Sequence, residues 1–162
     1  MSHIIVDGYN LIGIFHRDPE KARRELITDL SQYRKLTGHN ITVVFDGHGG
    51  MSATDKRSME AGVEVIFTRI GKRADDLIIE LSRKLAQSAI VISSDREVAD
   101  SVWRNGSVPV KSEVFADILE QRLSGGFDLE EEGWETDSGG VKGRGRKPSK
   151  RERAIMRAVK KL

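Results

Sequence analysis

Four aspartates stand at the ends of apolar, β-branched runs, just after them, or at the head of the helix that follows. They are Asp7, Asp46, Asp75 and Asp95. Gathered in one crevice, four carboxylates repel one another unless a cation lies between them, and Mg²⁺ or Mn²⁺ prefers oxygen ligands of this kind. A divalent ion held in this way can activate a water and neutralise charge on the leaving oxygen, which suits phosphodiester hydrolysis.

The elements that would bring these carboxylates together alternate along the chain. We predict strands over residues 3–7, 41–45, 63–67, 89–93 and 108–111, and helices over 19–37, 74–87, 95–103 and 112–123. Strands that alternate with helices in this way indicate right-handed βαβ units, a mostly parallel sheet and helices on both faces. Polar side chains at the carboxyl ends of such strands face the ligand crevice.

Two details complete this prediction of an α/β fold. The chain from Asp7 to Gly13 is expected to be a loop, because a glycine follows the strand directly. The helix that begins at Asp18-Pro19 has apolar residues at helical spacing as far as Leu36, and Gly38 ends it.

Helical geometry separates two adjacent aspartates in the helix over 74–87. The apolar stripe of this helix consists of Ala74, Leu77, Ile78, Leu81 and Leu85. At about 100° per residue, Asp75 lies on the shoulder of the stripe, whereas Asp76 points toward solvent. We therefore expect Asp75 to be the functional carboxylate of the pair.

Asp95 and Asn10 each allow two interpretations. Ser94 and Glu97 have the spacing of a capping box, which would make Asp95 the first helical residue, where it either binds a metal or only complements the helix dipole. Asn10 has an amide that could orient a water or a substrate phosphate. A single aspartate at a strand end is more often a turn former than a ligand, but four at matching ends favour a shared site.

Composition predicts one domain with a flexible basic C-terminal tail. The 162 residues have 38% hydrophobic content, which is enough for one compact core, and the absence of cysteine leaves no thiolate metal ligand. The glycines around His48 fit neither a P-loop nor a dinucleotide fingerprint, so no nucleotide cofactor is expected. No signal peptide and no membrane-spanning run is found, which favours a cytoplasmic protein.

Charge is divided unevenly along the chain. Residues 142–162 contain ten basic residues and one acidic residue, a charge of +9, so a net charge of +2 leaves −7 for the remainder. We predict a domain over 1–125, an acidic and then glycine-rich linker over 126–147, and a basic amphipathic helix over 148–162. This helix would begin at a capping box at Ser149, present Ile155, Val159 and Leu162 on one face, and order on a partner.

Basic residues beside Asp75 and in the tail are candidates for contacts with RNA phosphates. They are Arg69, Lys72, Arg73, Lys142, Arg144, Arg146, Lys147, Lys150 and Arg151. The alternative interpretation is that the first three only balance the acidic face and that the tail is a solvated terminal run.

Four motifs in this order resemble the NYN domains of the PIN-like nuclease superfamily, close to the YacP-like branch. They are V-D-G-Y-N-L-I at 6–12, V-F-D-G at 44–47, G-x-x-A-D-x-x-I at 71–78 and S-S-D at 93–95. The resemblance covers roughly residues 3–123 and implies a three-layer α/β/α fold. It also implies a Mg²⁺- or Mn²⁺-dependent endoribonuclease acting on mRNA, tRNA or rRNA, with the ribosome as a candidate partner. The matching positions are Asp7, Asn10, Asp75 and Asp95, and the match at Asp46 is looser.

Two other functions remain open. An RNA-binding module of the same fold whose catalysis has decayed would not need to keep every motif carboxylate. A phosphatase of the haloacid dehalogenase type would need an aspartate two residues after the nucleophile, and Tyr9 occupies that position.

Overall fold

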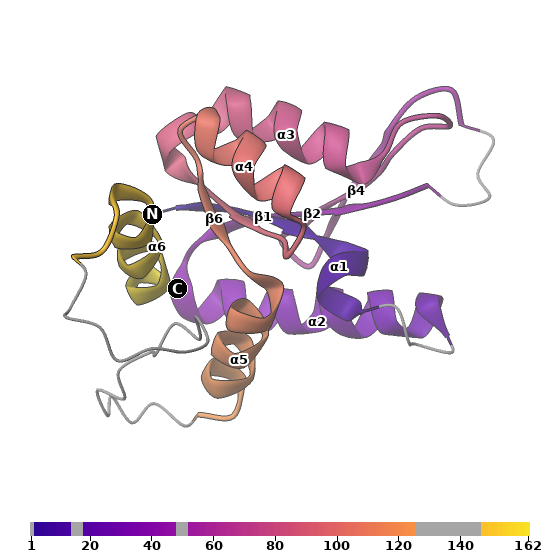
Figure 1. Ribbon diagram of the computed structural model, residues 1–162. Coiled ribbons are helices and arrows are strands. Elements are labelled where there is room, and N and C mark those ends of the chain that lie inside the picture. The colour runs from indigo at the N-terminus through magenta and orange to yellow at the C-terminus, as the bar shows by residue number, and fades with distance from the viewer. Residues whose placement is uncertain (1, 14–17, 48–51, 126–146) are drawn as a thin grey trace.

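A six-stranded sheet forms the middle layer of the protein, with helices on both of its faces (Figure 1). The computed structural model describes residues 2–13, 18–47, 52–125 and 147–162. The strand order is β3-β4-β2-β1-β5-β6, and every pair is parallel except β3 with β4. The strands are β1 (His3–Asp7), β2 (Asn40–Phe45), β3 (Lys56–Glu60), β4 (Val63–Phe67), β5 (Ala89–Ile92) and β6 (Val108–Val110). The predicted three-layer α/β fold is confirmed.

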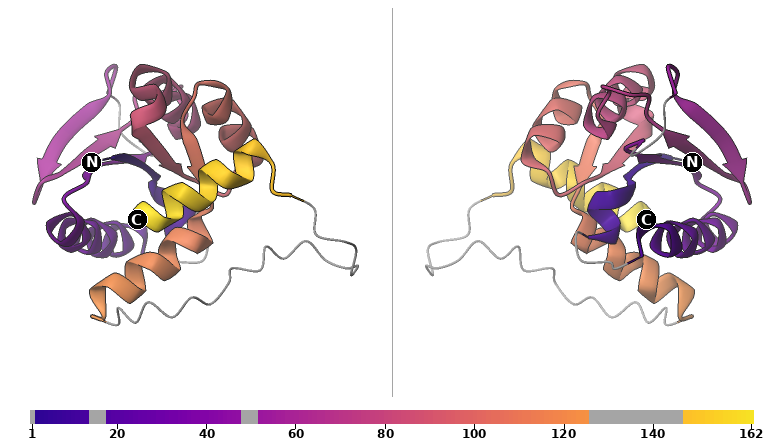
Figure 2. Two further views of the ribbon diagram at one scale, coloured as in Figure 1. Left: turned by 90° about the vertical axis from the view of Figure 1, so that its left-hand side faces the viewer. Right: turned by 90° about the vertical axis from the view of Figure 1, so that its right-hand side faces the viewer.

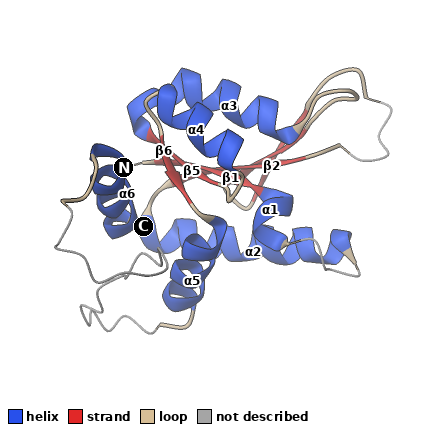
Figure 3. Cartoon of the chain, in the orientation of Figure 1, coloured by secondary structure: helices blue, strands red, loops and turns tan. Residues whose placement is uncertain are grey.

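Helices of the described residues lie between the strands along the chain, except that β2, β3 and β4 follow one another directly (Figure 3). They are α1 (Gly8–Ile12), α2 (Pro19–Thr37), α3 (Ala74–Leu85), the 3₁₀ turn η1 (Ala86–Ser88), α4 (Arg96–Arg104), α5 (Ser112–Leu123) and α6 (Lys150–Lys161). None of them is both long and apolar enough to cross a membrane.

Each face of the sheet has its own core, because successive side chains of a strand point to opposite faces. Ile4 and Val6 of β1 are fully buried on the face covered by α2, α5 and α6. Ile5 between them is fully buried on the other face, under α3 and α4. Figure 2 shows the two helical layers on either side of the sheet. These two cores fix β1, and with it Asp7, in the centre of the fold.

The segment after Asp7 is helical, so the expectation of a loop there is wrong. The five residues of α1 begin directly at Gly8. A Cβ atom at Gly8 would lie 2.2 Å from the ring of Phe45, so only glycine lets the helix start this close to β2. The motif glycine therefore serves close packing rather than loop flexibility.

Strand β3 was not predicted. All five of its residues are exposed, and it pairs with β4 as an antiparallel edge strand. A turn at Ala61 and Gly62, both with positive φ, connects the two strands. An edge strand without a buried face has no alternation of apolar and polar residues that a sequence pattern could reveal.

Helix α2 has the predicted ends but a shorter apolar stripe. The Asp18 side chain accepts a hydrogen bond from the Lys21 N–H, Pro19 is the first residue, and Gly38 ends the helix in the left-handed conformation. Leu36 is 63% exposed, so the buried side of the helix does not extend to it. The stripe ends one turn earlier, at Tyr33, which is fully buried.

Helix α6 packs against the domain instead of forming the flexible tail that we expected. It begins with the predicted capping box at Ser149 and runs along the β6 edge of the sheet (Figure 2). Ala158 and Leu162 are 4% and 1% exposed. The hydroxyl of Tyr33 donates to the Leu162 carbonyl at 2.5 Å, and Arg151 donates to Asp100 on α4 at 2.6 Å. The partner on which this apolar face orders is thus the protein's own core, while the predicted linker lies mainly outside the described residues.

The packing of α6 leads to a prediction that compares two leucines. Leu162→Ala should lower the free energy of unfolding by about 2–3 kcal/mol, because a fully buried side chain is removed. Leu36→Ala, at an exposed position, should change it by less than about 0.5 kcal/mol. Chemical denaturation of both variants measures the difference, and equal effects would show that α6 does not dock as described.

Candidate active site

The carboxyl ends of three neighbouring strands meet at one edge of the sheet. Strand β1 lies between β2 and β5, so the chain leaves β1 toward one side and later returns to the other, which is the topological switch point where α/β proteins bind ligands. Asp7 ends β1, Asp46 directly follows β2, and Ser93 directly follows β5. The parallel register therefore brings these three side chains to one edge of the sheet.

Asp7 is the most buried of the four aspartates, with 7% of its surface exposed. Its pKa is raised to about 6, mainly by burial and in addition by the negative charges of Asp75 and Asp46. Two hydrogen bonds act in the opposite direction, one from the Ser93 hydroxyl to Oδ2 at 3.2 Å and one from the backbone N–H of Asn10. A cation beside Asp7 would stabilise the charged carboxylate.

Asp75 and Asp76 occupy the two environments that the helical angles indicate. Asp75 is half-buried in the first turn of α3, whereas Asp76 is exposed. Burial raises the pKa of Asp75, Arg73 at 2.5 Å lowers it, and the charges of Asp95 and Asp46 raise it. Asp75 therefore interacts electrostatically with each of the other three aspartates, which makes them one cluster.

Asp46 connects β2 to the helix that carries Asp75. Its Oδ1 accepts a hydrogen bond from the backbone N–H of Ala74 at 2.7 Å. Ala74 is the first residue of α3, and the N-cap residue Arg73 makes no side-chain cap. A carboxylate from a neighbouring strand thus caps α3, and the positive end of the helix dipole lies beside the cluster.

Asp95 is the N-cap of α4 rather than its first residue, so the predicted capping box is wrong. Its Oδ1 accepts hydrogen bonds from the backbone N–H groups of Glu97 at 2.8 Å and Val98 at 3.1 Å. The Ser94 hydroxyl is engaged with α5 instead, since its oxygen accepts the Ser112 backbone N–H at 3.0 Å and it donates to Glu113 at 2.6 Å. The helix-capping interpretation of Asp95 therefore holds, and its charge still acts on Asp75.

The side-chain oxygen of Asn10 forms hydrogen bonds within the protein. Its Oδ1 accepts hydrogen bonds from the Ser94 backbone N–H at 2.9 Å and from the Ser112 hydroxyl at 2.6 Å. These bonds tie α1 to the loop after β5 and to the start of α5. Together with the N–H that Asn10 donates to Asp7, they indicate that Asn10 positions the cluster through its side-chain oxygen. That its amide orients a water or a phosphate stays a prediction.

The sequence reasoning missed Ser93, although its hydroxyl contacts two of the aspartates. It donates to Asp7 and accepts from the backbone N–H of Asp95 at 3.2 Å. The S-S-D motif was the available signal, since a serine between a strand end and an aspartate suits hydrogen bonding to neighbouring carboxylates.

The basic candidates beside Asp75 differ in their availability. Lys72 is only 16% exposed in its side chain and pairs with Glu80 at 2.9 Å and with Asp55 at 3.7 Å, so the prediction that it binds RNA has no support. Arg73 is 72% exposed, and Arg69 is also exposed. These two arginines are the candidates of this loop that can still meet a phosphate.

The tail candidates are also unequal. Lys147 and Lys150 are exposed, while Arg151 is partly exposed and pairs with Asp100. Three further candidates lie outside the described residues, namely Lys142, Arg144 and Arg146.

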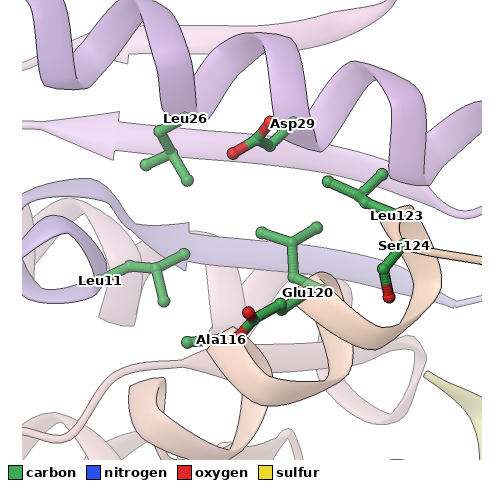
Figure 4. Close-up of a pocket in the computed structure, with 8 residues that line it drawn as sticks. Leu11, Leu26, Asp29, Ala116, Glu120, Leu123 and Ser124 are labelled. Atoms are coloured by element: carbon green, nitrogen blue, oxygen red, sulfur yellow. The ribbon is translucent and has the colours of Figure 1, made fainter. Parts of the chain in front are cut away.

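A groove elsewhere is less suited to phosphate chemistry. It has a volume of about 470 Å³ and lies between α1, α2 and α5, where Leu11, Leu26 and Leu123 form apolar walls (Figure 4). Its polar lining includes Asp29 and Glu120, and none of the four clustered aspartates lines it. The four gathered aspartates could hold a cation that a phosphate also binds, so the carboxylate edge is the better candidate.

The donor set of the cluster fits a hard divalent cation, since it consists of carboxylate and hydroxyl oxygens. Within the described ranges, no three His, Cys, Asp or Glu side chains are arranged to hold a metal ion. The buried, mutually repelling carboxylates of Asp7 and Asp75 are the observation that favours a cation here. They would hold the ion, with the remaining oxygens of Asp46 and Asp95 as candidate partners.

Three comparisons with known proteins agree with one another. Residues 4–133 match the family model of the YacP-like NYN domain. The uncharacterized protein YacP of Bacillus subtilis is 36% identical over 108 residues, which span 62% of this chain and 61% of that protein. The match thus covers less than two thirds of the relative's own length.

Solved structures resemble this fold in the same way. The crystal structure of Rae1 (YacP) from Bacillus subtilis has a TM-score of 0.60 at 29% identity and covers 76% of this chain and 78% of that one. A single-residue mutant of Rae1 gives a TM-score of 0.60 at 28% identity, over 76% of this chain and 80% of the other.

The raised pKa of Asp7 predicts how stability depends on pH without metal. Because its folded-state pKa of about 6 exceeds the ordinary 3.8, the folded protein binds the proton more tightly than the unfolded chain. The contribution of Asp7 to stability is therefore most favourable below about pH 4 and is lost as the pH rises through about 6. In EDTA at pH 7, Asp7→Asn should raise the free energy of unfolding by up to about 3 kcal/mol and flatten this dependence.

Thermal denaturation in EDTA from pH 4 to 7 measures the effect. Asp117→Asn, at an exposed position on α5, is the matched control and should follow the wild-type curve. A less stable Asp7→Asn protein at pH 7 would contradict the electrostatic description of the cluster.

Proposed function

We propose that this chain, which belongs to the YacP-like NYN domain family, is a Mg²⁺- or Mn²⁺-dependent endoribonuclease. The observation that supports this most is Asp7, buried beside Asp46 and Asp75 at the switch point of a nuclease-like α/β fold. Proteins seldom bury a carboxylate among like charges unless a ligand compensates for them. A divalent cation with an RNA phosphate is such a ligand.

Each residue of the cluster has a defined part in this proposal. A bound divalent ion would supply a water of lowered pKa and neutralise charge on the phosphate. Asp7 and Asp75 would hold the ion, and Ser93 and Asn10 keep Asp7 in place through their hydrogen bonds. Arg73, exposed beside Asp75, would pair with a phosphate oxygen of the substrate.

The proposed substrates are cytoplasmic mRNA, tRNA or rRNA, including RNA on the ribosome. A catalytically inactive RNA-binding module of the same fold is the alternative. The repulsion at Asp7 favours the enzyme, since a module that only binds RNA gains nothing from buried negative charge beside a polyanion. The phosphatase alternative would need a general acid at Tyr9, whose hydroxyl instead accepts a hydrogen bond from Arg23.

The basic face of α6 has a separate part in the proposal. The carbonyl of Lys161 accepts a hydrogen bond from His39 just before β2, which places this end of α6 at the amino ends of the strands. The aspartates lie at the carboxyl ends. The exposed lysines and arginines of α6 would therefore contact an RNA away from the cleaved bond, as a clamp for longer substrates.

The function is tested by incubating the purified protein with total RNA, with and without Mn²⁺, and mapping new RNA ends. Asp75→Asn should reduce the metal-dependent cleavage rate by on the order of 100-fold, because a metal ligand loses its charge. Asp76→Asn, the same substitution at the exposed neighbour, should change it by no more than about twofold.

Two results would contradict the proposal. Absence of metal-dependent cleavage by the wild-type protein would favour the inactive RNA-binding module. Equal reductions in the two variants would show that Asp75 has no special place in the site.

The clamp is tested by charge substitutions rather than by ending the chain at Val141, because such a truncation would also remove Leu162 from the core. A variant with Lys150→Gln, Arg153→Gln and Arg157→Gln removes three exposed cations of α6. Its affinity for a long single-stranded RNA should depend less on salt, with a log–log slope smaller by about 0.7 for each phosphate that α6 no longer neutralises. Cleavage of a short RNA at saturating concentration should persist, and an unchanged slope would exclude the clamp.

A further inference from the structure

Three aromatic rings lie at the same edge of the sheet as the carboxylates but on its opposite face. Tyr9 on α1, Phe45 at the end of β2 and Phe67 at the end of β4 belong to the core on the α2 side. The ring centroids of Tyr9 and Phe45 are 5.2 Å apart in an edge-to-face contact, and Phe45 stacks on Phe67 at 5.4 Å. Phe45 is fully buried, so Tyr9 and Phe67 are the two rings that reach the surface.

Arg23 of α2 completes this cluster. Its guanidinium carbon is 5.4 Å from the centroid of the Phe67 ring, and its Nη1 donates a hydrogen bond to the Tyr9 hydroxyl at 2.9 Å. Both partners are neutral. Among the described residues, no carboxylate lies within ion-pair distance of Arg23.

Neighbouring basic residues on α2 behave differently. Lys21 pairs with Glu25 at 3.9 Å and Arg24 pairs with Glu20 at 3.6 Å, each one helical turn apart on the exposed side. Arg23 is half-buried, and its planar group is held in one orientation by a ring and a hydroxyl. A positioned guanidinium without an anionic partner is suited to bind a phosphate, for which its five donors are matched.

The position of this cluster relative to the cleavage edge suggests which part of a substrate it meets. Tyr9 follows Asp7 by two residues, and Phe45 directly precedes Asp46. A strand of RNA whose scissile phosphate lies at Asp7 must cross the end of the sheet on one side or the other. On the side of α2 it meets Arg23 and the edges of two aromatic rings, which bind phosphates and bases without sequence preference.

We propose that Arg23, Tyr9 and Phe67 form a nucleotide subsite for single-stranded RNA beside the carboxylates. Arg23 binds a phosphate next to the one that is cleaved, and the attached base stacks on the Arg23 plane, which the Phe67 ring holds in place. This inference rests on the proposed function for its substrate class and adds the residues that position the strand. If the cluster only joins α1 and α2 to the sheet, its members will affect stability and not RNA binding.

The first test measures binding of a short fluorescent single-stranded RNA by anisotropy in EDTA across a salt series. Arg23→Gln should reduce the log–log salt slope by about 0.7, the value for one phosphate contact on a single strand. Arg24→Gln, the same substitution at the adjacent exposed position, should leave the slope unchanged. Equal slopes for wild type and Arg23→Gln, or no measurable binding by the wild type, would overturn the subsite.

The second test combines the removal of single bases from the RNA with substitutions in the protein and measures binding. In a series of RNAs with one abasic position each, wild-type binding should weaken by roughly tenfold at one position near the cleavage site. In Phe67→Leu that position should lose its effect, because the ring that holds the Arg23 plane is gone, whereas Trp103→Leu on α4 should keep it. Independent, multiplicative effects of the abasic position and Phe67→Leu would overturn the stacking.

These readouts are separate from folding and from catalysis. Thermal denaturation shows whether each variant is folded, and Arg23→Gln supplies a second variant if Phe67→Leu is not. Binding is measured in EDTA, so the dependence of the abasic effect on Phe67 can be observed even if the protein does not cleave RNA. That combination of results would refute only the proposed function. Metal-dependent cleavage, with an abasic effect that does not depend on Phe67, would refute only the subsite.

Discussion

The burial of Asp7 beside other carboxylates is the constraint on which the rest of the structure depends. A carboxylate that is 7% exposed and faces the charges of Asp75 and Asp46 is unfavourable by itself, as its pKa of about 6 shows. Two apolar cores on either side of β1 hold the backbone that carries it. Hydrophobic burial of this extent offsets the local electrostatic cost, so the fold can keep a site that its own charges oppose.

The N-termini of α3 and α4 partly compensate for the negative charge of the cluster. Asp46 accepts the N–H of the first residue of α3, and Asp95 accepts two N–H groups at the start of α4. Each carboxylate thus lies at the positive end of a helix while its charge still acts on Asp75. The same bonds couple the helices to the strands, so the spacing of the cluster is set by rigid elements rather than by loops.

The two faces of the sheet carry different parts of the proposed site. The α3 and α4 side carries the acidic groups, and the α2 side carries aromatic rings with Arg23. Period-two alternation produces this separation, since residues one apart at a strand end face opposite layers. The carboxyl-terminal end of α6 lies at the amino ends of the strands, away from the cluster.

Local periodicity and strand-end position were sufficient to predict the parallel α/β architecture, most element boundaries and the different environments of Asp75 and Asp76. The partner that each polar group meets depends instead on how distant segments pack. Ser94 donates to α5 and leaves the cap to Asp95, and Lys72 is held by acidic residues from other segments. Strand β3 and the docking of α6 likewise depend on surfaces distant in sequence, and no local pattern contains the packing energy of such contacts.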